Sequence, residues 1–222
     1  MSTERLAVVR AHESAPSTNK VIRNTYLLLS MTLAFSAVTA GVSMAVGAQP
    51  MHWIVLLAVM IGGPFAIHAL RNSVWSLPLT FAFTGALGWF LGPVLTFYLS
   101  LPNGGEIVTT AMGMTAAIFL GLSAYALTTR KDFSFLGGFV VVGFLVVLAA
   151  IIANIFLEIP ALSLAISAAA VLLVSTAILF DTSRMVNGGE TNYVTMTVAL
   201  YSNLYVLFLH LLNLISAFTG DD

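Results

Sequence analysis

Residues 133–157 read FSFLGGFVVVGFLVVLAAIIANIFL, and no ionisable side chain interrupts this stretch. About 20 helical residues, each rising about 1.5 Å, cross the roughly 30 Å hydrocarbon core of a bilayer. The stretch is therefore predicted to be a transmembrane helix. A strand is excluded, because lipid offers no hydrogen-bond partner to an unpaired backbone and the run lacks the alternating pattern of a membrane barrel.

The rest of the chain repeats this pattern of apolar runs separated by short polar connections. Of its 222 residues, 59% are hydrophobic and 8% are charged, and the mean hydropathy is +1.00. A soluble domain carries about a quarter charged residues, so most of this surface is predicted to face lipid. We expect an all-α integral membrane protein, a single seven-transmembrane-helix bundle formed by residues 21–222. The spans are predicted near residues 25–48, 53–70, 79–99, 107–129, 133–157, 161–183 and 194–218.

The cationic residues predict the orientation of this bundle. All eight Lys and Arg residues lie in the N-terminal segment or in the connections after the second, fourth and sixth spans: Arg5, Arg10, Lys20, Arg23, Arg71, Arg130, Lys131 and Arg184. The charged residues of the opposite connections and the C-terminus are all acidic: Glu106, Glu158, Asp221 and Asp222. Cytoplasmic loops are enriched in Lys and Arg. The N-terminus is therefore expected in the cytoplasm and the C-terminus in the periplasm of a bacterial inner membrane.

The segment from Met1 to Lys20 is polar, mixed in charge and interrupted by Pro16. It cannot bury enough apolar surface to fold by itself, so a disordered cytoplasmic tail is predicted. Two roles remain open for it. It serves only as a leader that fixes the topology, or it is a partner-binding segment that a cytoplasmic protein grips.

Small residues recur at helix-packing spacing at two places in the predicted spans. They are Gly85, Gly88 and Gly92 in the third span, and Gly113, Ala116 and Ala117 in the fourth. In membranes, small side chains let two helices approach closely. Both sets are predicted to be packing surfaces.

Composition and motifs argue against several functional classes. A net charge of −1 gives no basic face for a nucleic acid, and the absence of cysteine removes thiolate nucleophiles and Cys-ligated metals. The only His-Glu pair, His12-Glu13, lacks the second His of a zinc protease. Asp181 is the only Asp in a span, whereas an aspartyl protease needs two. No Gly-x-Ser-x-Gly elbow is present, and no lysine in a span could carry retinal. We therefore expect no enzyme, no cofactor and no metal site.

Ionisable residues inside spans are costly and are candidates for function. They are Asp181 in the sixth span, His68 in the second with Arg71 one turn later, and His210 in the seventh. Structural alternatives stay open for each. Asp181 could be solvated or paired with Arg184, and both histidines could be hydrogen-bonded packing residues. Three amides are equally compatible with interhelical hydrogen bonding: Asn154, Asn203 and Asn213.

Six short motifs, in order along the chain, carry a family resemblance. They are residues 24–30 (NTYLLLS), 81–85 (FAFTG), 91–93 (LGP), 128–138 (TTRKDFSFLGG), 178–181 (ILFD) and 188–193 (GGETNY). Together they resemble the transmembrane Bax inhibitor motif family, and most closely its bacterial branch named for YccA. The resemblance extends from about residue 20 to the C-terminus. It implies a bundle in which the seventh helix is central.

The resemblance implies two lines of function. YccA-like proteins bind FtsH, a membrane-anchored ATP-dependent protease, and restrain its attack on membrane substrates. Other relatives are described as pH-responsive calcium leak channels, so Ca²⁺ or H⁺ would be the ligand. The first line requires no catalytic residue and makes the tail from Met1 to Lys20 a candidate handle for the protease.

The leak line can be compared residue by residue. Leaky relatives carry two aspartates, on helices six and seven, that share a proton. Asp181 matches the first, but the second position is Asn203, which can donate a hydrogen bond and cannot titrate. The relatives also have a glutamate in helix two, which this chain lacks, and an arginine at its cytoplasmic end, near His68 or Arg71. A single carboxylate is a poor Ca²⁺ site. The favoured expectation is therefore FtsH modulation, with Asp181, Asn203, His68 and Arg71 as ion-path or pH-sensor candidates for the alternative.

Overall fold

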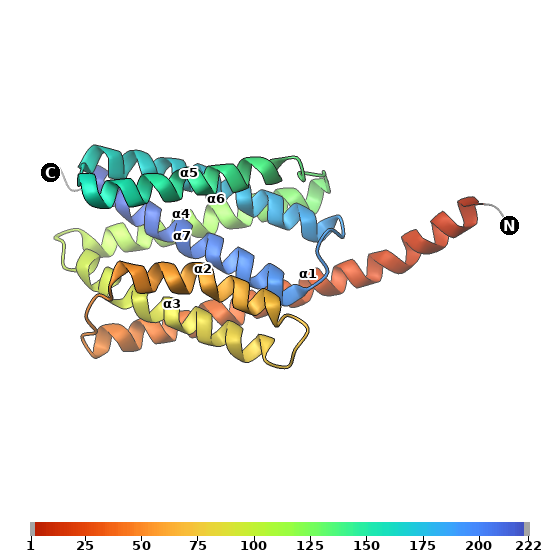
Figure 1. Ribbon diagram of the computed structural model, residues 1–222, viewed down its shortest axis with the longest axis horizontal. Helices are drawn as coiled ribbons and strands as arrows, with labels where there is room; N and C mark the ends of the chain where they lie inside the picture. The colour runs from red at the N-terminus through yellow and green to blue at the C-terminus, as the bar shows by residue number, and fades with distance from the viewer. Residues whose placement is uncertain (1–2, 220–222) are drawn as a thin grey trace.

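The computed structural model describes residues 3–219, with side chains from residue 18 onward, as seven helices without a strand in that range. Figure 1 shows them running roughly parallel or antiparallel to one another. In chain order they are α1 (Thr3–Ala45), α2 (Trp53–Ala69), α3 (Ser76–Leu99), α4 (Gly104–Thr129), α5 (Leu136–Leu157), α6 (Pro160–Val186) and α7 (Tyr193–Thr219). The all-helical prediction is confirmed.

Six of the described helices are long and apolar enough to cross a membrane, and α2, with 17 residues, is shorter. At about 1.5 Å per residue, α2 extends roughly 26 Å, slightly less than a typical hydrocarbon core. Pro64 lies inside it. A protein with several membrane spans is thus confirmed, and the crossing by α2 remains a prediction.

Helix boundaries differ most from the prediction at α1, whereas α3, α4, α5 and α6 begin or end within a few residues of the predicted bounds. α5 begins at Leu136 rather than near 133, because the Asp132 carboxylate accepts a hydrogen bond from the Ser134 amide and holds the preceding residues in a turn. α1 begins at Thr3, so most of the segment expected to be a disordered tail has helical backbone that projects beyond the bundle (Figure 1). Its Ala, Leu, Glu and Arg residues are compatible with helix. Met1 and Ser2 lie outside the described residues. That the tail is disordered in solution stays a prediction.

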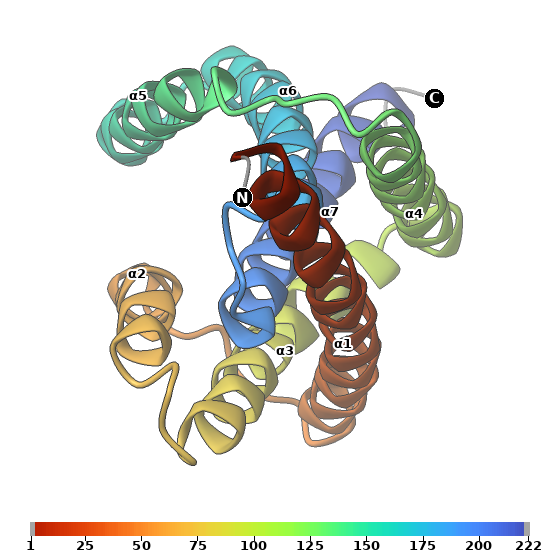
Figure 2. The same ribbon diagram turned by 90° about the vertical axis from the view of Figure 1, so that its right-hand side faces the viewer.

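α7 packs against α1, α2, α3, α4 and α6, and many of its side chains are buried. Figure 2, viewed from the end where α1 projects, shows α7 between the α1–α3 side and the α5–α6 side. α5 has a different environment. It packs against α6 and has no buried residue, so its remaining faces are available to lipid.

α1 and α3 share the most extensive contact between two described helices, and small side chains let them approach closely. A Cβ atom at Gly88 would overlap the Ser36 carbonyl and the Thr39 hydroxyl, and one at Gly92 would overlap Ser43. The Ser43 hydroxyl donates a 2.8 Å hydrogen bond to the Trp89 carbonyl across this contact. The third-span set is therefore confirmed as a packing surface.

The small residues of the fourth span have a different role from the one predicted. A Cβ atom at Gly113 would meet nothing within 4 Å, so no described helix packs against it. Ala116 faces an open groove instead. Spacing alone gave a wrong prediction here, because a helix in lipid can leave a small-residue face without a partner helix.

Candidate functional site

The Asp181 carboxylate and the Asn203 amide meet between α6 and α7. The Asn203 side chain donates a 2.9 Å hydrogen bond to Asp181 Oδ2, and both residues are half-buried. The two helices are joined by a short connection and pack along each other, which brings positions 22 residues apart into register. The structure thus pairs one carboxylate with a neutral donor.

Arg184 does not form the ion pair with Asp181 that the sequence left open. Its guanidinium lies over the Phe180 ring, 5.4 Å from the centroid, and lies 3.8 Å from Glu190. With 38% of its side chain exposed, this pair contributes little to stability. Within the described part of the chain, Asp181 therefore has no cation as a salt-bridge partner.

The connection between α6 and α7 is held by its own polar side chains. Glu190 accepts hydrogen bonds from the Thr191 and Asn192 amides, and Asn192 caps α7 by accepting from Val194 and Thr195. The Asn192 amide group also donates to the Arg71 carbonyl, 3.1 Å away. Asn192 thereby joins the α2–α3 connection to the start of α7. Sequence reasoning singled out the GGETNY string without assigning this role.

His68 and Arg71 form a separate pair at the end of α2. His68 Nε2 and Arg71 Nη1 lie 3.2 Å apart, and His68 is exposed. α2 packs against α3 and α7, and no backbone contact between α2 and α6 occurs among the described residues. The structure brings Asp181 to Asn203, but it does not bring His68 or Arg71 to Asp181.

A second polar cluster lies between α6 and α7, farther toward the C-terminal end of α7. The Asn213 amide donates to Ser167 at 2.8 Å and to Ser163 at 3.3 Å, and His210 Nδ1 lies 3.0 Å from Ser167 Oγ. His210 and Asn213 therefore match the expectation of interhelical hydrogen bonds. Asn154 does not, because its side chain accepts from the Ile159 amide in the α5–α6 connection.

Tyr201 joins three helices, a role that the sequence did not predict. It is 1% exposed, and its hydroxyl donates to the Thr84 carbonyl at 3.1 Å and lies 2.6 Å from the Ser36 hydroxyl. These contacts join α7 to α3 and α1. The signal available in sequence was its position two residues before Asn203.

An apolar groove of about 660 Å³ opens between α1 and α4. No backbone contact between these two helices occurs within residues 3–219, and α7 forms part of the groove lining. The wall includes Ala37 and Gly41 from α1 and Phe119 from α4. Most of its lining is apolar, which suits a surface exposed to lipid.

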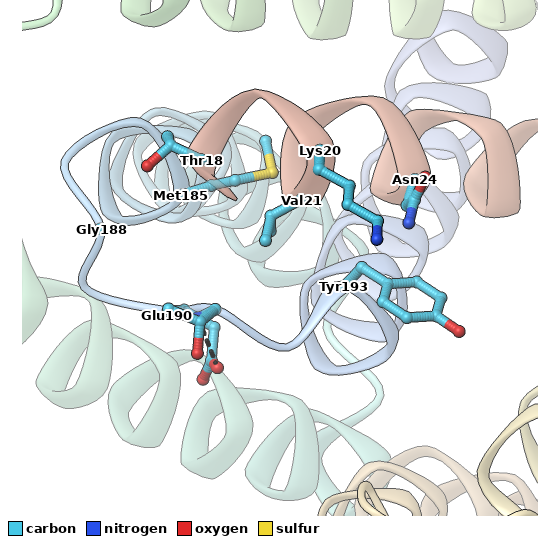
Figure 3. Close-up of a pocket in the computed structure, with 9 residues that line it drawn as sticks. Thr18, Lys20, Val21, Asn24, Met185, Gly188, Glu190 and Tyr193 are labelled. Atoms are coloured by element: carbon cyan, nitrogen blue, oxygen red, sulfur yellow. Dashed lines mark hydrogen bonds between the residues drawn. The ribbon is translucent and has the colours of Figure 1, made fainter. Parts of the chain in front are cut away.

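A smaller pocket of about 300 Å³ lies where α1 leaves the bundle. Figure 3 shows the α6–α7 connection curving past Gly188 and Glu190 on one side, with Lys20 and Asn24 on the α1 side. The pocket thus combines the base of the N-terminal segment with the GGETNY string. No group of three or more His, Asp and Glu residues that could hold a metal ion occurs in the part that the structure describes.

Comparison with known proteins places this geometry in a family. The sequence model of the family described as inhibitor of apoptosis-promoting Bax1 matches residues 18–220. The chain belongs to the Bax inhibitor family. A protein named modulator of FtsH protease YccA, from Escherichia coli K12, is 49% identical over 205 residues, which cover 92% of this chain and 93% of that protein.

Two further relatives of this family member are similar over most of the chain. An uncharacterized protein of Pseudomonas aeruginosa is 50% identical over 202 residues, or 91% of each chain. An uncharacterized membrane protein of Vibrio cholerae is 42% identical over 227 residues, and the aligned region covers 100% of each chain. With six long apolar helices in its described part and relatives named as membrane proteins, this member of the Bax inhibitor family is a multi-pass protein of the inner membrane.

Proposed function

We propose that this protein is non-enzymatic, and that it binds FtsH and restrains that protease in membrane-protein quality control. The observation that carries the proposal is its 49% identity, over nearly the whole of both chains, to the relative named as a modulator of FtsH protease.

The distribution of charge supports an N-terminus in the cytoplasm and a C-terminus in the periplasm. Lys20, Arg71, Arg130 and Arg184 lie at helix ends or connections on one side of the bundle, the side from which α1 projects (Figure 1). Glu158 lies in a connection on the other side. An excess of Lys and Arg in the loops on one side of the membrane is typical of the cytoplasmic side. The segment before Lys20 would then extend into the compartment where ATP-dependent proteolysis takes place.

The N-terminal segment is the proposed handle for the protease. An ATP-dependent protease must engage a segment that extends from the membrane, and α1 projects well beyond the other helices. Four residues of α1 line the pocket beside the α6–α7 connection, so a pull on the segment would load this junction first: Thr18, Lys20, Val21 and Asn24. The proposed handle therefore begins beside the α6–α7 connection.

Resistance to extraction is the second element of the proposal. We infer that α7 acts as the central helix, since it packs against five named helices and Tyr201 hydrogen-bonds toward α1 and α3. The α1–α3 contact through Gly88 and Gly92 would hold the helix that carries the handle. A bundle held in this way could occupy the protease without being quickly degraded.

The alternative, a pH-responsive calcium or cation leak, receives less support from the contacts. Asp181 meets an amide in place of a second carboxylate, and His68 and Arg71 contact other elements. A Ca²⁺ ion prefers several charged oxygen ligands. Asp181, Asn203, His68 and Arg71 remain candidates for an ion path or a proton sensor if ion flux is measured.

Purification of FtsH from membranes that contain this protein tests the proposal. Three forms are compared: the full chain, a chain lacking residues 2–18, and a chain in which residues 2–18 are replaced by a Gly/Ser segment of equal length. Asp181→Asn serves as a control that alters the alternative site alone. We expect the full chain and Asp181→Asn to co-purify with the protease, and both tail variants to do so weakly. Absence of co-purification for the full chain would contradict the proposal.

A further inference from the structure

The groove between α1 and α4 is long enough to follow the depth of the membrane. Its α1 wall includes residues from Tyr26 to Met44, a stretch of helix that extends about 27 Å, close to the thickness of a hydrocarbon core. Small residues line both walls: Ala37 and Gly41 on α1, and Ala116 on α4. A Cβ atom at Gly41 would meet nothing within 4 Å, so no described side chain fills this part of the groove.

Tyr205 contributes an unpaired hydroxyl to the groove. This residue lines the groove and is 6% exposed, yet its hydroxyl forms no hydrogen bond with any residue that the structure describes. Other hydroxyls of the lining are paired. Those of Ser36 and Tyr201 lie 2.6 Å apart, and Thr115 donates to the Ala111 carbonyl at 2.7 Å. The Tyr205 oxygen is not sealed inside the bundle, so a molecule in the groove can reach it.

The position of Tyr205 favours a helix over a lipid chain in this groove. Tyr205 lies midway along α7, near the middle of the bilayer, where lipid offers only hydrocarbon and no hydrogen-bond partner. A transmembrane helix can supply one, because polar side chains hydrogen-bond between helices and small residues let their backbones approach. Beside the groove, α4 has such small residues in open space, since a Cβ atom at Gly113 or Gly121 would meet nothing within 4 Å.

We infer that the groove binds a transmembrane helix of the FtsH-type protease, an inference that rests on the proposed function. The reason for this occupant is α1, which carries the proposed handle and, from Tyr26 onward, forms a wall of the groove. A membrane-anchored protease that holds the handle has its own membrane helices beside this wall. The bound helix carries a hydrogen-bonding side chain, such as Ser, Thr, Asn or Gln, at the depth of Tyr205.

Co-purification of FtsH with a groove-filling variant tests this docking site. Gly41→Leu fills the groove, and Gly62→Leu on α2 is the matched control, because a Cβ atom at either position meets nothing within 4 Å. We expect Gly41→Leu to lower the recovered protease about fivefold or more, the effect of overpacking at a contact, and the control to match wild type. Equal recovery with Gly41→Leu and Gly62→Leu would overturn the inference.

Tyr205→Phe tests the hydrogen bond to the bound helix. It should lower the recovered protease about threefold, as expected for one hydrogen bond between membrane helices. Tm of the purified variant should equal that of wild type, because the hydroxyl has no partner within the described bundle. Undiminished recovery of the protease, or a Tm as low as that of Tyr201→Phe, would overturn the role of Tyr205.

Photo-crosslinking in membranes identifies the occupant. Benzoylphenylalanine replaces Leu120, which lines the groove and is 61% exposed, or Phe65 on α2, which is 73% exposed and lies outside the groove. We expect crosslinks to FtsH from the first position and none from the second. If the full chain co-purifies with FtsH but Leu120 crosslinks to a second copy of this chain, or to lipid alone, the inference fails and the proposed function stands. If the full chain does not co-purify, both fail.

Discussion

The side-chain amide of Asn203 donates a 2.9 Å hydrogen bond to Oδ2 of Asp181, so the one aspartate inside the described spans is paired with a group that cannot titrate. The contact joins α6 to α7 near the end of the bundle where Arg184 and Glu190 also lie. This geometry favours a structural role for Asp181, because sharing a proton would require a second carboxylate in place of Asn203.

Asn203→Leu should destabilise the bundle because it leaves the half-buried Asp181 carboxylate without its donor. A loss of about 1–3 kcal/mol in the free energy of unfolding is expected for such a group. The double variant Asp181→Leu/Asn203→Leu should recover part of this loss, since no unpaired polar group remains. Thermal unfolding of the four proteins in a double-mutant cycle measures the coupling. Strictly additive effects would show that the pair has no energetic link.

Asn203→Asp should make stability depend on pH. Two carboxylates at this distance cannot both ionise cheaply, so the folded pair retains a proton that the unfolded chain releases. Where the folded state binds more protons, stability falls as pH rises. Tm of Asn203→Asp relative to wild type should therefore be lower at pH 8 than at pH 5. A constant difference across this range would indicate that the two side chains move apart.

Gly88→Ala should destabilise the α1–α3 contact, because the added methyl group overlaps Ser36 and Thr39. Overpacking of this kind costs about 1–3 kcal/mol. Gly113→Ala is the matched control on α4, where the methyl group meets open space. It should be neutral or stabilising by up to about 1 kcal/mol, since Ala favours helix over Gly. Equal effects of the two substitutions on Tm would argue against the close α1–α3 contact.

Tyr201→Phe should lower stability by about 1–2 kcal/mol, because it removes the hydrogen bond to the Thr84 carbonyl and the contact with Ser36. Tyr125→Phe provides the comparison, since Tyr125 is 45% exposed. Tm measurements on both variants distinguish a specific hydrogen bond from a general effect of losing a phenol. A similar Tm for Tyr201→Phe and wild type would remove Tyr201 from the account of bundle stability.

Hydropathy and length predicted most of this fold because lipid imposes a strong requirement for long apolar helices. They did not predict which face of each helix packs inward. Lipid is as apolar as the bundle interior, so α5, which has no buried residue, is even more hydrophobic in sequence than α7, which has many. The open face at Gly113 depends on helix rotation, which apolar composition does not specify.

The candidate site was partly predictable. The family resemblance predicts that Asp181 and Asn203 face each other, and the structure has a hydrogen bond between them. The pairing of Arg184 with Glu190 could not be read from helical spacing, because Glu190 lies in a connection whose path is set by Asn192 and its own amide contacts. The separation of His68 from Asp181 likewise follows from the position of α2 beside α3 and α7.

The half-life of an unassembled membrane substrate of FtsH, measured in cells with and without excess of this protein, tests the central claim most directly. Restraint of the protease predicts a clearly longer half-life with the full chain, a smaller effect when residues 2–18 are deleted, and no difference between wild type and Asp181→Asn. A half-life that is unchanged by excess full-length protein, inserted in the membrane at comparable levels, would contradict the account.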